Sequence, residues 1–294
     1  MANPKALVKR RKAIRNIRKI TRTMELIATA RFKKALDRAS EAEAFTRKIA
    51  ELAAELSATA TTVTHPLLQQ RSEVKTSVLL VLTSNRGLCG GYNASILREA
   101  SLAMREMQRD GVKLQLELSG KRAITFCRYN GLKAEHTYSQ FEDKPAFDEV
   151  QPIADRYIQA FTSGAIDRVQ VAYMKFLSAS VQRPVVETLL PLSTAAPPTK
   201  GAAPAPKQAV EYEFVPDAAD ILQELLPISF KVRLFKCFLD AAVSEQIARR
   251  VTMKQATENA DEMIRSITLR YNRARQAGIT KEILEVISGA EALK

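Results

Sequence analysis

Both ends of the chain carry long stretches without glycine or proline, and this feature most limits the available folds. Neither residue occurs between Lys5 and His65, where apolar or small residues recur every three or four positions. A second stretch begins after Pro227, runs to Gly278 and keeps the same spacing as far as Ile287. The spacing predicts a helix of about 50 residues or more at each end, roughly 80 Å long at 1.5 Å per residue.

Each predicted helix has a narrow stripe of apolar and small residues and a wide polar surface. Winding the two helices together as a two-stranded coiled coil is the simplest way to bury both stripes. The alternative, separate helices folded into a bundle, needs turn signals that the two stretches lack. The first stripe consists of Ile14, Ile17, Ile20, Met24, Ala28, Phe32, Ala35, Ala39, Ala42, Phe45, Ile49, Leu52 and Leu56. The second consists of Ile228, Val232, Phe235, Leu239, Val243, Ile247, Met253, Ala256, Ala260, Met263, Ile267, Tyr271 and Ala274.

The hydrophobic pattern of residues 72–192 predicts a separate unit in which strands and helices alternate. The run TSVLLVLT at 76–83 is almost wholly apolar and has the length of a buried strand. Alternation favours a mainly parallel sheet with helices on both faces, closed at one edge by a strand at 185–190. The remaining strands are expected at 113–118, 132–138 and 168–176, and the helices at 93–108, 121–129 and 148–163.

The expected fold class is therefore α+β in two parts, a long coiled coil and a Rossmann-like α/β domain. The coiled-coil helices are expected in 1–65 and 217–294, with the α/β domain in 72–192 and an insertion in 193–211. The insertion reads STAAPPTKGAAPAPKQ at 193–208, and its four prolines and many alanines are typical of an exposed tether. A passive loop is the simpler interpretation, and a regulatory loop is the alternative.

The net charge of +13 is concentrated in one segment. Residues 1–34 hold twelve Lys or Arg against one acid, Glu25, so the other 260 residues carry only +2. One basic segment on a near-neutral body favours a single surface that meets an anionic partner. A basic coiled-coil nucleic-acid binder is the alternative. A mitochondrial transit peptide is disfavoured because the apolar pattern continues unbroken past residue 34.

The residue patterns by themselves do not indicate catalysis. The glycines at 87, 90 and 91 follow a strand and precede a helix, but they match neither nucleotide-binding glycine motif, which favours a tight structural turn over a phosphate site. The two histidines, His65 and His136, have no Cys or carboxylate at ligand spacing. Three distant cysteines indicate neither disulfides nor zinc, and Cys89 is interpreted as a packed residue rather than a reactive thiol.

Four segments, at both ends and in the centre, carry a resemblance to a known family. They are ITRTMELIA at 20–28 with the lysine pair at 33–34, SNRGLCGGYN at 84–93, SEQIAR at 244–249 with MKQATENA at 253–260, and ITKEI at 279–283 with SGA at 288–290. Together they are similar to the gamma subunit of the rotary, proton-translocating F-type ATP synthase. The resemblance runs over nearly the whole chain in the same order.

The resemblance implies an antiparallel coiled coil that serves as the central rotor shaft inside a ring of alternating alpha and beta subunits. The α/β domain would form a foot that joins the epsilon subunit and the ring of membrane c subunits. Proton flow would rotate the foot, and the shaft would drive the beta subunits through different nucleotide affinities. Nucleotides would bind to beta and alpha, so the resemblance implies no catalytic site, cofactor, metal or nucleic acid for this chain. The positions implied to touch the beta ring or tune coupling are Arg22, Met24, Glu245, Arg249, Gln276, Thr280 and Glu282; the alternative for each is an ordinary solvated or seam position.

Two departures from the family pattern qualify these expectations. The chain has Arg250 where a methionine is usual, which adds a charge beside Arg249. The tether is longer than the common form and has no cysteine pair, so thiol regulation as in chloroplast members is not expected. Because the pattern begins by about residue 5, no cleavable leader is expected. We therefore expect a peripheral protein at the cytoplasmic face of a bacterial inner membrane, without a span of its own.

Overall fold

A computed structural model describes residues 4–59, 65–71, 73–141, 144–192 and 218–291. The chain divides into two compact units, one made of residues 1–30 and 249–294 and the other of residues 31–248, which are described separately below. The insertion expected at 193–211 lies outside the described residues. In chain order the elements are α1 (Pro4–Thr59), the short 3-10 helix η1 (Pro66–Leu68), β1 (Thr76–Leu82), α2 (Tyr92–Arg109), β2 (Lys113–Ser119), α3 (Lys121–Tyr129), β3 (His136–Tyr138), α4 (Phe147–Thr162), β4 (Arg168–Phe176), β5 (Gln182–Leu190) and α5 (Ala218–Glu291).

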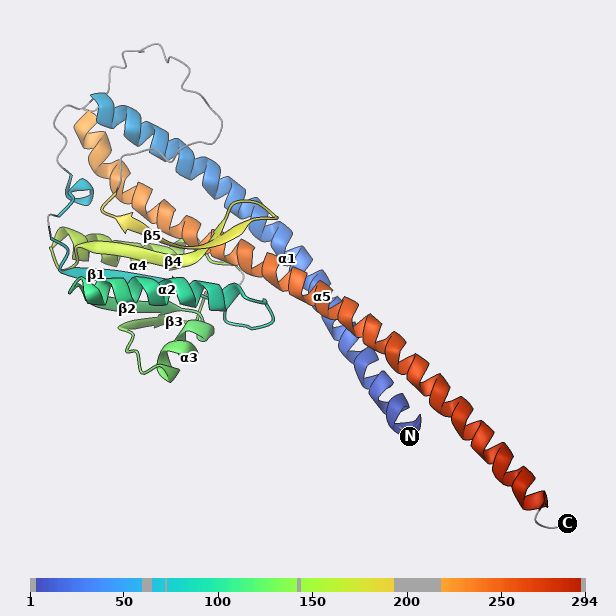
Figure 1. Cartoon of the computed structure of the whole chain (residues 1–294). Helices are drawn as coiled ribbons and strands as arrows, with labels where there is room; N and C mark the ends of the chain where they lie inside the picture. Colours follow the sequence, from blue (N-terminus) through green and yellow to red (C-terminus); the bar gives the residue numbers. More distant parts are fainter. Residues whose placement is uncertain (1–3, 60–64, 72, 142–143, 193–217, 292–294) are drawn as a thin grey trace. The chain divides into compact units, whose positions relative to one another are not determined.

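The larger unit is built on a five-stranded sheet with the order β3-β2-β1-β4-β5 (Figure 1). β1 pairs in parallel with β2 and with β4, and β3 pairs in parallel with β2. Only β5 is antiparallel, paired with β4 at the edge. The parallel strands are linked through helices because a parallel crossover needs a long connection. The expected parallel-rich sheet and its edge strand are confirmed.

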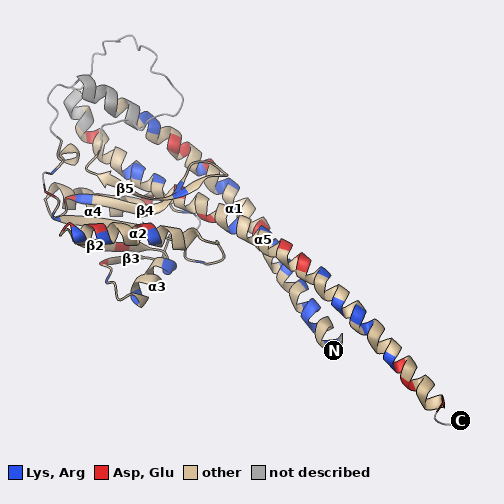
Figure 2. Cartoon of the chain, in the orientation of Figure 1, with Lys and Arg blue, Asp and Glu red and all other residues tan. Residues whose placement is uncertain are grey.

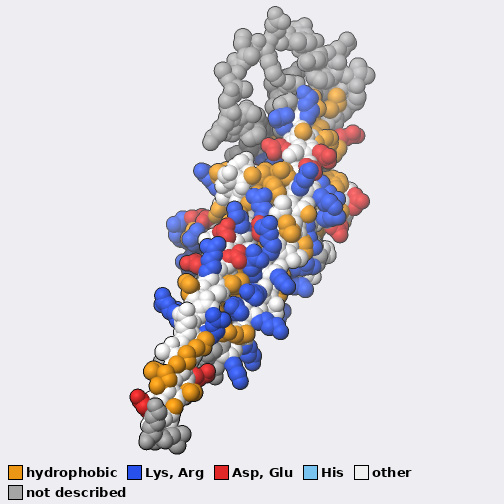
Figure 3. Space-filling model, turned by 90° about the vertical axis from the view of Figure 1, so that its right-hand side faces the viewer, with side chains coloured by type: hydrophobic (Ala, Val, Ile, Leu, Met, Phe, Trp, Pro, Cys, Tyr) orange, Lys and Arg blue, Asp and Glu red, His pale blue; other side chains and the backbone are white. Residues whose placement is uncertain are grey.

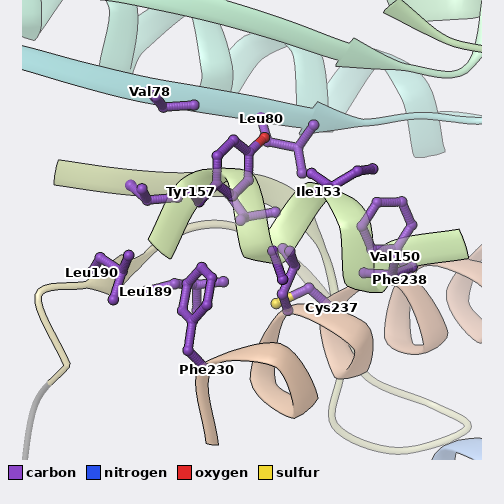
Figure 4. Close-up of a cluster of buried hydrophobic side chains, with 14 of the residues drawn as sticks. Val78, Leu80, Val150, Ile153, Tyr157, Leu189, Leu190, Phe230, Cys237 and Phe238 are labelled. Carbon is purple, nitrogen blue, oxygen red and sulfur yellow. The ribbon is translucent and has the colours of Figure 1, made fainter. Parts of the chain in front are cut away.

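Alternate residues of the central strands face two different cores. Val78 and Leu80 of β1 pack with α4, β5 and the first part of α5, whereas Leu79 and Val81 pack with α2 and α3. In Figure 4 the α5 side chains Phe230, Cys237 and Phe238 reach the first core together with Val150, Ile153 and Tyr157 of α4. Both faces of the sheet are thus covered by helices, which explains the unbroken apolar run of β1.

Within this unit, α1 packs on α5 through small side chains. Ala35 and Ala39 of α1 are buried against Leu239, Val243 and Ile247 of α5. Because the side chains are small, the helix backbones can approach closely while each turn buries little apolar area.

In the smaller unit, the first part of α1 packs on the last part of α5. Ile14 is buried with Ala260 and Ile267, and Thr21 lies against Thr257. Earlier residues of α1 therefore meet later residues of α5, and within this unit the two helices run in opposite directions.

The structure corrects the predicted stripes at six positions. The exposed residues that were expected in the seam are Ile17, Ile20, Phe45, Leu52, Ile228 and Met263. The buried position on α1 is Thr21, seven residues from both Ile14 and Ala28. Seven-residue spacing keeps a position on the same face of a helix, whereas the three-residue steps from Ile14 through Ile17 to Ile20 drift away from it.

Three element boundaries also differ from the expectation. β5 begins at Gln182 rather than 185. β3 begins at His136 rather than 132, because Gly131 (φ +67°) lets the Leu132 amide cap the Cys127 carbonyl at the end of α3. α5 begins at Ala218 and passes through Pro227, which was expected to precede it. Proline has no N–H for the helix ladder, but Leu226 and Phe230 on either side of it are buried in the core and hold the helical path.

Candidate functional site

The first half of α1 presents a strongly basic surface. Between residues 4 and 30 it carries nine Lys or Arg and the single acid Glu25, and Figure 2 shows the cations along this part of the helix. Eight of the nine are exposed: Lys5, Lys9, Arg10, Lys12, Arg15, Arg18, Lys19 and Arg22. The ninth, Arg11, is half-buried with its guanidinium 5.3 Å from the centre of the Tyr271 ring. Such a field attracts acidic groups over a distance without fixing one geometry.

Polar contacts join the two helices across the seam of the smaller unit. The Thr257 hydroxyl donates to the Thr21 hydroxyl at 2.8 Å, and both side chains are buried. One turn away, Arg18 Nε lies 2.5 Å from Asp261 Oδ1 in a largely exposed ion pair. An exposed ion pair contributes little stability, so this one favours the observed register of the helices only weakly.

Large apolar side chains are also exposed in the smaller unit. On α1 these are Val8, Ile17, Ile20, Leu26 and Ile27. Hydrophobic side chains also gather toward the end of α5 in Figure 3, where the exposed residues are Ile279, Ile283, Leu284, Val286 and Ile287. The most exposed of these five is Val286, at 72%. A helix that leaves this much apolar surface in water is suited to contact a protein partner.

The predicted coupling residues fall into three places. Arg22 and Met24 lie on α1, where Arg22 is exposed and pairs with Glu25 at 2.8 Å while Met24 is half-buried. Gln276, Thr280 and Glu282 are exposed near the end of α5. The Thr280 hydroxyl donates to the Gln276 carbonyl at 3.0 Å, which brings these two together within one turn.

Glu245 and Arg249 lie one helical turn apart on α5, and both are half-buried. Glu245 belongs to the larger unit, whereas Arg249 and its neighbour Arg250 begin the α5 part of the smaller one. The predicted set is therefore spread along the helices and does not form a single compact site.

The glycine loop after β1 is held by its own hydrogen bonds. The first amides of α3 donate inward: Lys121 to the Asn85 side-chain oxygen, Arg122 to the Ser84 carbonyl and Ala123 to the Thr83 hydroxyl. The helix that follows the glycine loop is α2, and Tyr92 at its start donates its amide to the Cys89 carbonyl at 3.2 Å. The Ser84 amide donates to the Asn93 side-chain oxygen, and the Ser84 hydroxyl donates to the Arg86 carbonyl. These bonds within the loop favour the tight structural turn over a phosphate site.

Cys89 is a packed residue of this loop. Its thiol is 2% exposed and accepts a hydrogen bond from the Asn93 amide at 3.1 Å. The arrangement agrees with the expected packed cysteine.

A buried polar group lies where α5 crosses the sheet, and the sequence patterns gave no sign of it. Asp240 is 2% exposed, and its Oδ2 accepts from Lys236 Nζ at 3.1 Å. Burial raises the pKa of Asp240 to about 6, with the negative charge of Glu43 acting in the same direction and Lys236 opposing it. Nearby, Glu187 accepts from Tyr173 and Lys175, and these hydrogen bonds help lower its pKa.

Two further residues of the resemblance motifs acquire structural roles that the sequence did not reveal. The Tyr92 hydroxyl donates to the Ala241 carbonyl of α5 at 3.0 Å, and the Ser244 hydroxyl donates to the Met174 carbonyl of β4 at 3.2 Å. Only their position in the quoted motifs could have drawn attention to them, because a tyrosine or serine in a helix gives no pattern of its own.

The described residues contain neither a cluster of metal ligands nor a membrane-spanning helix. They bring no three His, Cys, Asp or Glu side chains together at metal-binding distance. None of the helices, over its described part, is apolar enough for long enough to cross a membrane.

Comparisons with known proteins place the chain in a family. The family model described as ATP synthase matches residues 3–293. A chain of Rhodopirellula baltica called ATP synthase gamma chain is 52% identical, with full coverage of both sequences. A Synechococcus chain of the same name is 38% identical and is covered over 99% of its length.

Solved structures agree at the level of the fold. A chain from the OSCP/F1/c-ring part of the Euglena gracilis mitochondrial ATP synthase superposes with a TM-score of 0.64 at 14% identity, covering 99% of this chain and 94% of that one. The rotor structure from the same organism gives a TM-score of 0.59 at 13% identity, covering 94% and 98%.

The chain belongs to the ATP synthase gamma-chain family. It is a non-catalytic subunit of the enzyme complex and forms the central stalk of the F1 sector. The alternative of a nucleic-acid binder finds no support in these relatives.

Proposed function

We propose that this stalk works as a rotor shaft made of an antiparallel coiled coil of α1 and α5. The observation that carries the proposal is the seam, where Ile14, Thr21, Ala28 and Ala35 are buried at intervals of seven residues. A seven-residue repeat of buried positions is the signature of supercoiled helices. Small seam residues and unbroken helices give a stiff, thin shaft. The proposed division of the chain is the one expected from the sequence: two shaft helices, an α/β domain at 72–192 and an insertion at 193–211.

The partners follow from the family and from the surfaces. The basic face of α1 can attract the acidic groups of a surrounding alpha and beta ring. The exposed apolar end of α5 can make hydrophobic contacts with a protein that surrounds it closely. The α/β unit would be the foot that meets the epsilon subunit and the c-ring. Proton flow through the membrane sector would rotate the foot, and the shaft would carry that rotation to the catalytic beta subunits.

The seven coupling positions named from the resemblance stand as proposed contacts with the beta ring. Their exposure supports this role for Arg22, Gln276, Thr280 and Glu282. The cellular site that fits is the cytoplasmic face of a bacterial inner membrane, where the chain is held by its partners. The insertion is proposed to be a passive loop.

Co-assembly with alpha and beta subunits tests the proposed function. The expected result is a stable complex in which addition of this chain raises ATPase activity. Absence of a complex, or a complex without a gain in activity, contradicts the rotor role. Steeply salt-dependent binding of the isolated chain to DNA would instead favour the nucleic-acid binder.

Arg249→Ala tests coupling in the membrane-bound complex. It is expected to reduce proton-driven ATP synthesis more than ATP hydrolysis, because synthesis requires the shaft to transmit the full torque. Arg109→Ala is a matched control, since it removes an exposed arginine from the end of α2. Equal loss of synthesis and hydrolysis would indicate an assembly defect.

Deletion of residues 195–206 tests the passive loop. Assembly and hydrolysis are both expected to persist. A change in hydrolysis with intact assembly would show that the insertion regulates the enzyme.

A further inference from the structure

One stretch of α5 is fastened to several elements of the α/β layer in succession. Lys231 Nζ lies 2.6 Å from Asp155 of α4, and an Arg233 guanidinium nitrogen lies 3.9 Å from Glu187 of β5. Further along, the Ala241 carbonyl accepts from the Tyr92 hydroxyl of α2 at 3.0 Å. The Ser244 hydroxyl then donates to β4. Within fourteen residues, α5 is tied to four different elements by polar contacts.

These contacts flank an apolar stripe. Leu234 and Phe238 lie in the core beneath α5, together with Phe230 and Cys237 (Figure 4). At about 100° per residue, Lys231 and Arg233 stand roughly 160° apart, one on each side of that stripe. A rotation of α5 about its own axis therefore strains the contacts on one side or the other, whereas the apolar stripe alone resists rotation weakly because its contacts have little directionality.

Glu187 is the most heavily bonded member of the group. Its Oε2 accepts from the Tyr173 hydroxyl at 2.7 Å and from Lys175 Nζ at 2.9 Å, and its other oxygen faces Arg233. Tyr173 and Lys175 both belong to β4, so the sheet itself holds the carboxylate in place, independently of α5. Hydrogen bonds to a charged group are stronger than neutral ones, so the Tyr173 and Lys175 bonds hold this carboxylate in place, and Arg233 faces it at 3.9 Å as an ion pair.

Ser244 of α5 donates to the Met174 carbonyl, which has no hydrogen-bond donor opposite it in the sheet. Met174 lies opposite Pro184 in the β4–β5 ladder. Proline has no N–H, so Pro184 cannot donate to the Met174 carbonyl. The Ser244 hydroxyl, itself 1% exposed, supplies a donor at that point and fastens the helix to the end of the sheet.

We propose that residues 231–244 of α5 form the clamp through which the α/β unit turns the shaft. In this clamp Tyr92, Glu187 and Ser244 are positioning residues: they hold α5 at a fixed angle on the sheet, and they touch neither nucleotide nor the beta ring. The proposal rests on the rotor function above. From residue 244 onward, α5 carries the imposed rotation along its own covalent helix into the second unit.

The test compares complexes of the whole ATP synthase reconstituted in vesicles. One complex carries Tyr92→Phe with Ser244→Ala, a second carries Glu187→Gln, and a third carries Tyr138→Phe as the control. Tyr138→Phe also removes a phenol hydroxyl, one that donates to the buried carboxylate of Glu117 on β2 rather than to α5. For each complex, ATP-driven proton pumping is measured against ATP hydrolysis, and hydrogen exchange is followed in 231–244.

The clamp variants are expected to hydrolyse ATP while pumping fewer protons for each ATP, because part of the rotation is lost where the shaft meets the sheet. Amides of 231–244 are expected to exchange about fivefold faster for each hydrogen bond removed. The control is expected to match the wild type in both measurements. If a clamp variant fails to assemble, Ser244→Ala alone, which removes one hydroxyl, decides the outcome.

Clamp variants that match Tyr138→Phe in pumping and in exchange overturn the clamp while leaving the rotor function intact. A wild-type complex that hydrolyses ATP without pumping overturns the rotor function itself. The two failures are therefore distinguished within one experiment.

Discussion

The Thr257 hydroxyl of α5 donates to the Thr21 hydroxyl of α1 at 2.8 Å, and Thr21 in turn lies 3.1 Å from the Arg18 carbonyl of its own helix. This relay places two buried polar groups in the same seam as the apolar residues Ile14, Ala260 and Ile267. The pair can form only when these two residues meet, so a slip of one helix along the other would leave both hydroxyls without each other. It thus specifies the alignment of the helices.

Replacement of these threonines should show that their contributions to the free energy of unfolding depend on each other. Thr257→Val is expected to lower the free energy of unfolding by about 1 kcal/mol, because one buried hydrogen bond is lost while the shape is kept. The double variant Thr21→Val with Thr257→Val should lose less than the sum of the single changes, since the hydrogen bond between the two hydroxyls is lost only once. A double-mutant cycle from urea unfolding measures this, and strict additivity would show that the hydroxyls do not interact.

Enlargement of a seam residue should force the helices apart. Ala28 is fully buried, so Ala28→Leu is expected to destabilise the chain by about 1–3 kcal/mol through overpacking. Ala30→Leu, at an exposed position two residues later, is the control and should have little effect. Thermal unfolding gives the comparison, and equal midpoints for the two variants would contradict a close-packed seam.

Asp240 should make stability depend on pH. Its pKa is about 6 in the folded chain against 3.8 in the unfolded chain, so the folded state holds the proton more tightly. Its contribution is therefore fully present below pH 4 and is lost as pH rises to about 6, by roughly 3 kcal/mol. Asp240→Asn should remove this slope. Parallel curves for the two proteins between pH 4 and 7 would refute this assignment.

Gly120 should tolerate no side chain. Its φ is +94°, and an added Cβ would lie 2.1 Å from the Thr83 carbonyl oxygen. Gly120→Ala is expected to cost at least about 2 kcal/mol, from backbone strain together with the clash. Gly91→Ala, where a Cβ would meet nothing within 4 Å, is the matched control. Comparable unfolding midpoints for both variants would mean that the loop can rearrange.

Much of the architecture followed from periodicity, and the failures have identifiable causes. Strands such as β1 were predictable because burial on both faces demands an unbroken apolar run. Ile17 and Ile20 were misplaced because an apolar residue on a shaft need not face its own partner helix, and Thr21 was missed because its burial depends on a hydroxyl 236 positions away. The contacts of Tyr92 and Ser244 are equally nonlocal, so no window of sequence could show them.

The inward hydrogen bonds of the glycine loop have a consequence for ligand binding. In open α/β sheets, small ligands commonly bind beyond the carboxyl ends of the strands, the same edge at which Asn85 and Thr83 occupy the first amides of α3. A phosphate could settle there only by displacing bonds that also hold the loop in shape. At this helix N-terminus, side chains of the chain itself therefore occupy amides that a nucleotide phosphate would otherwise use.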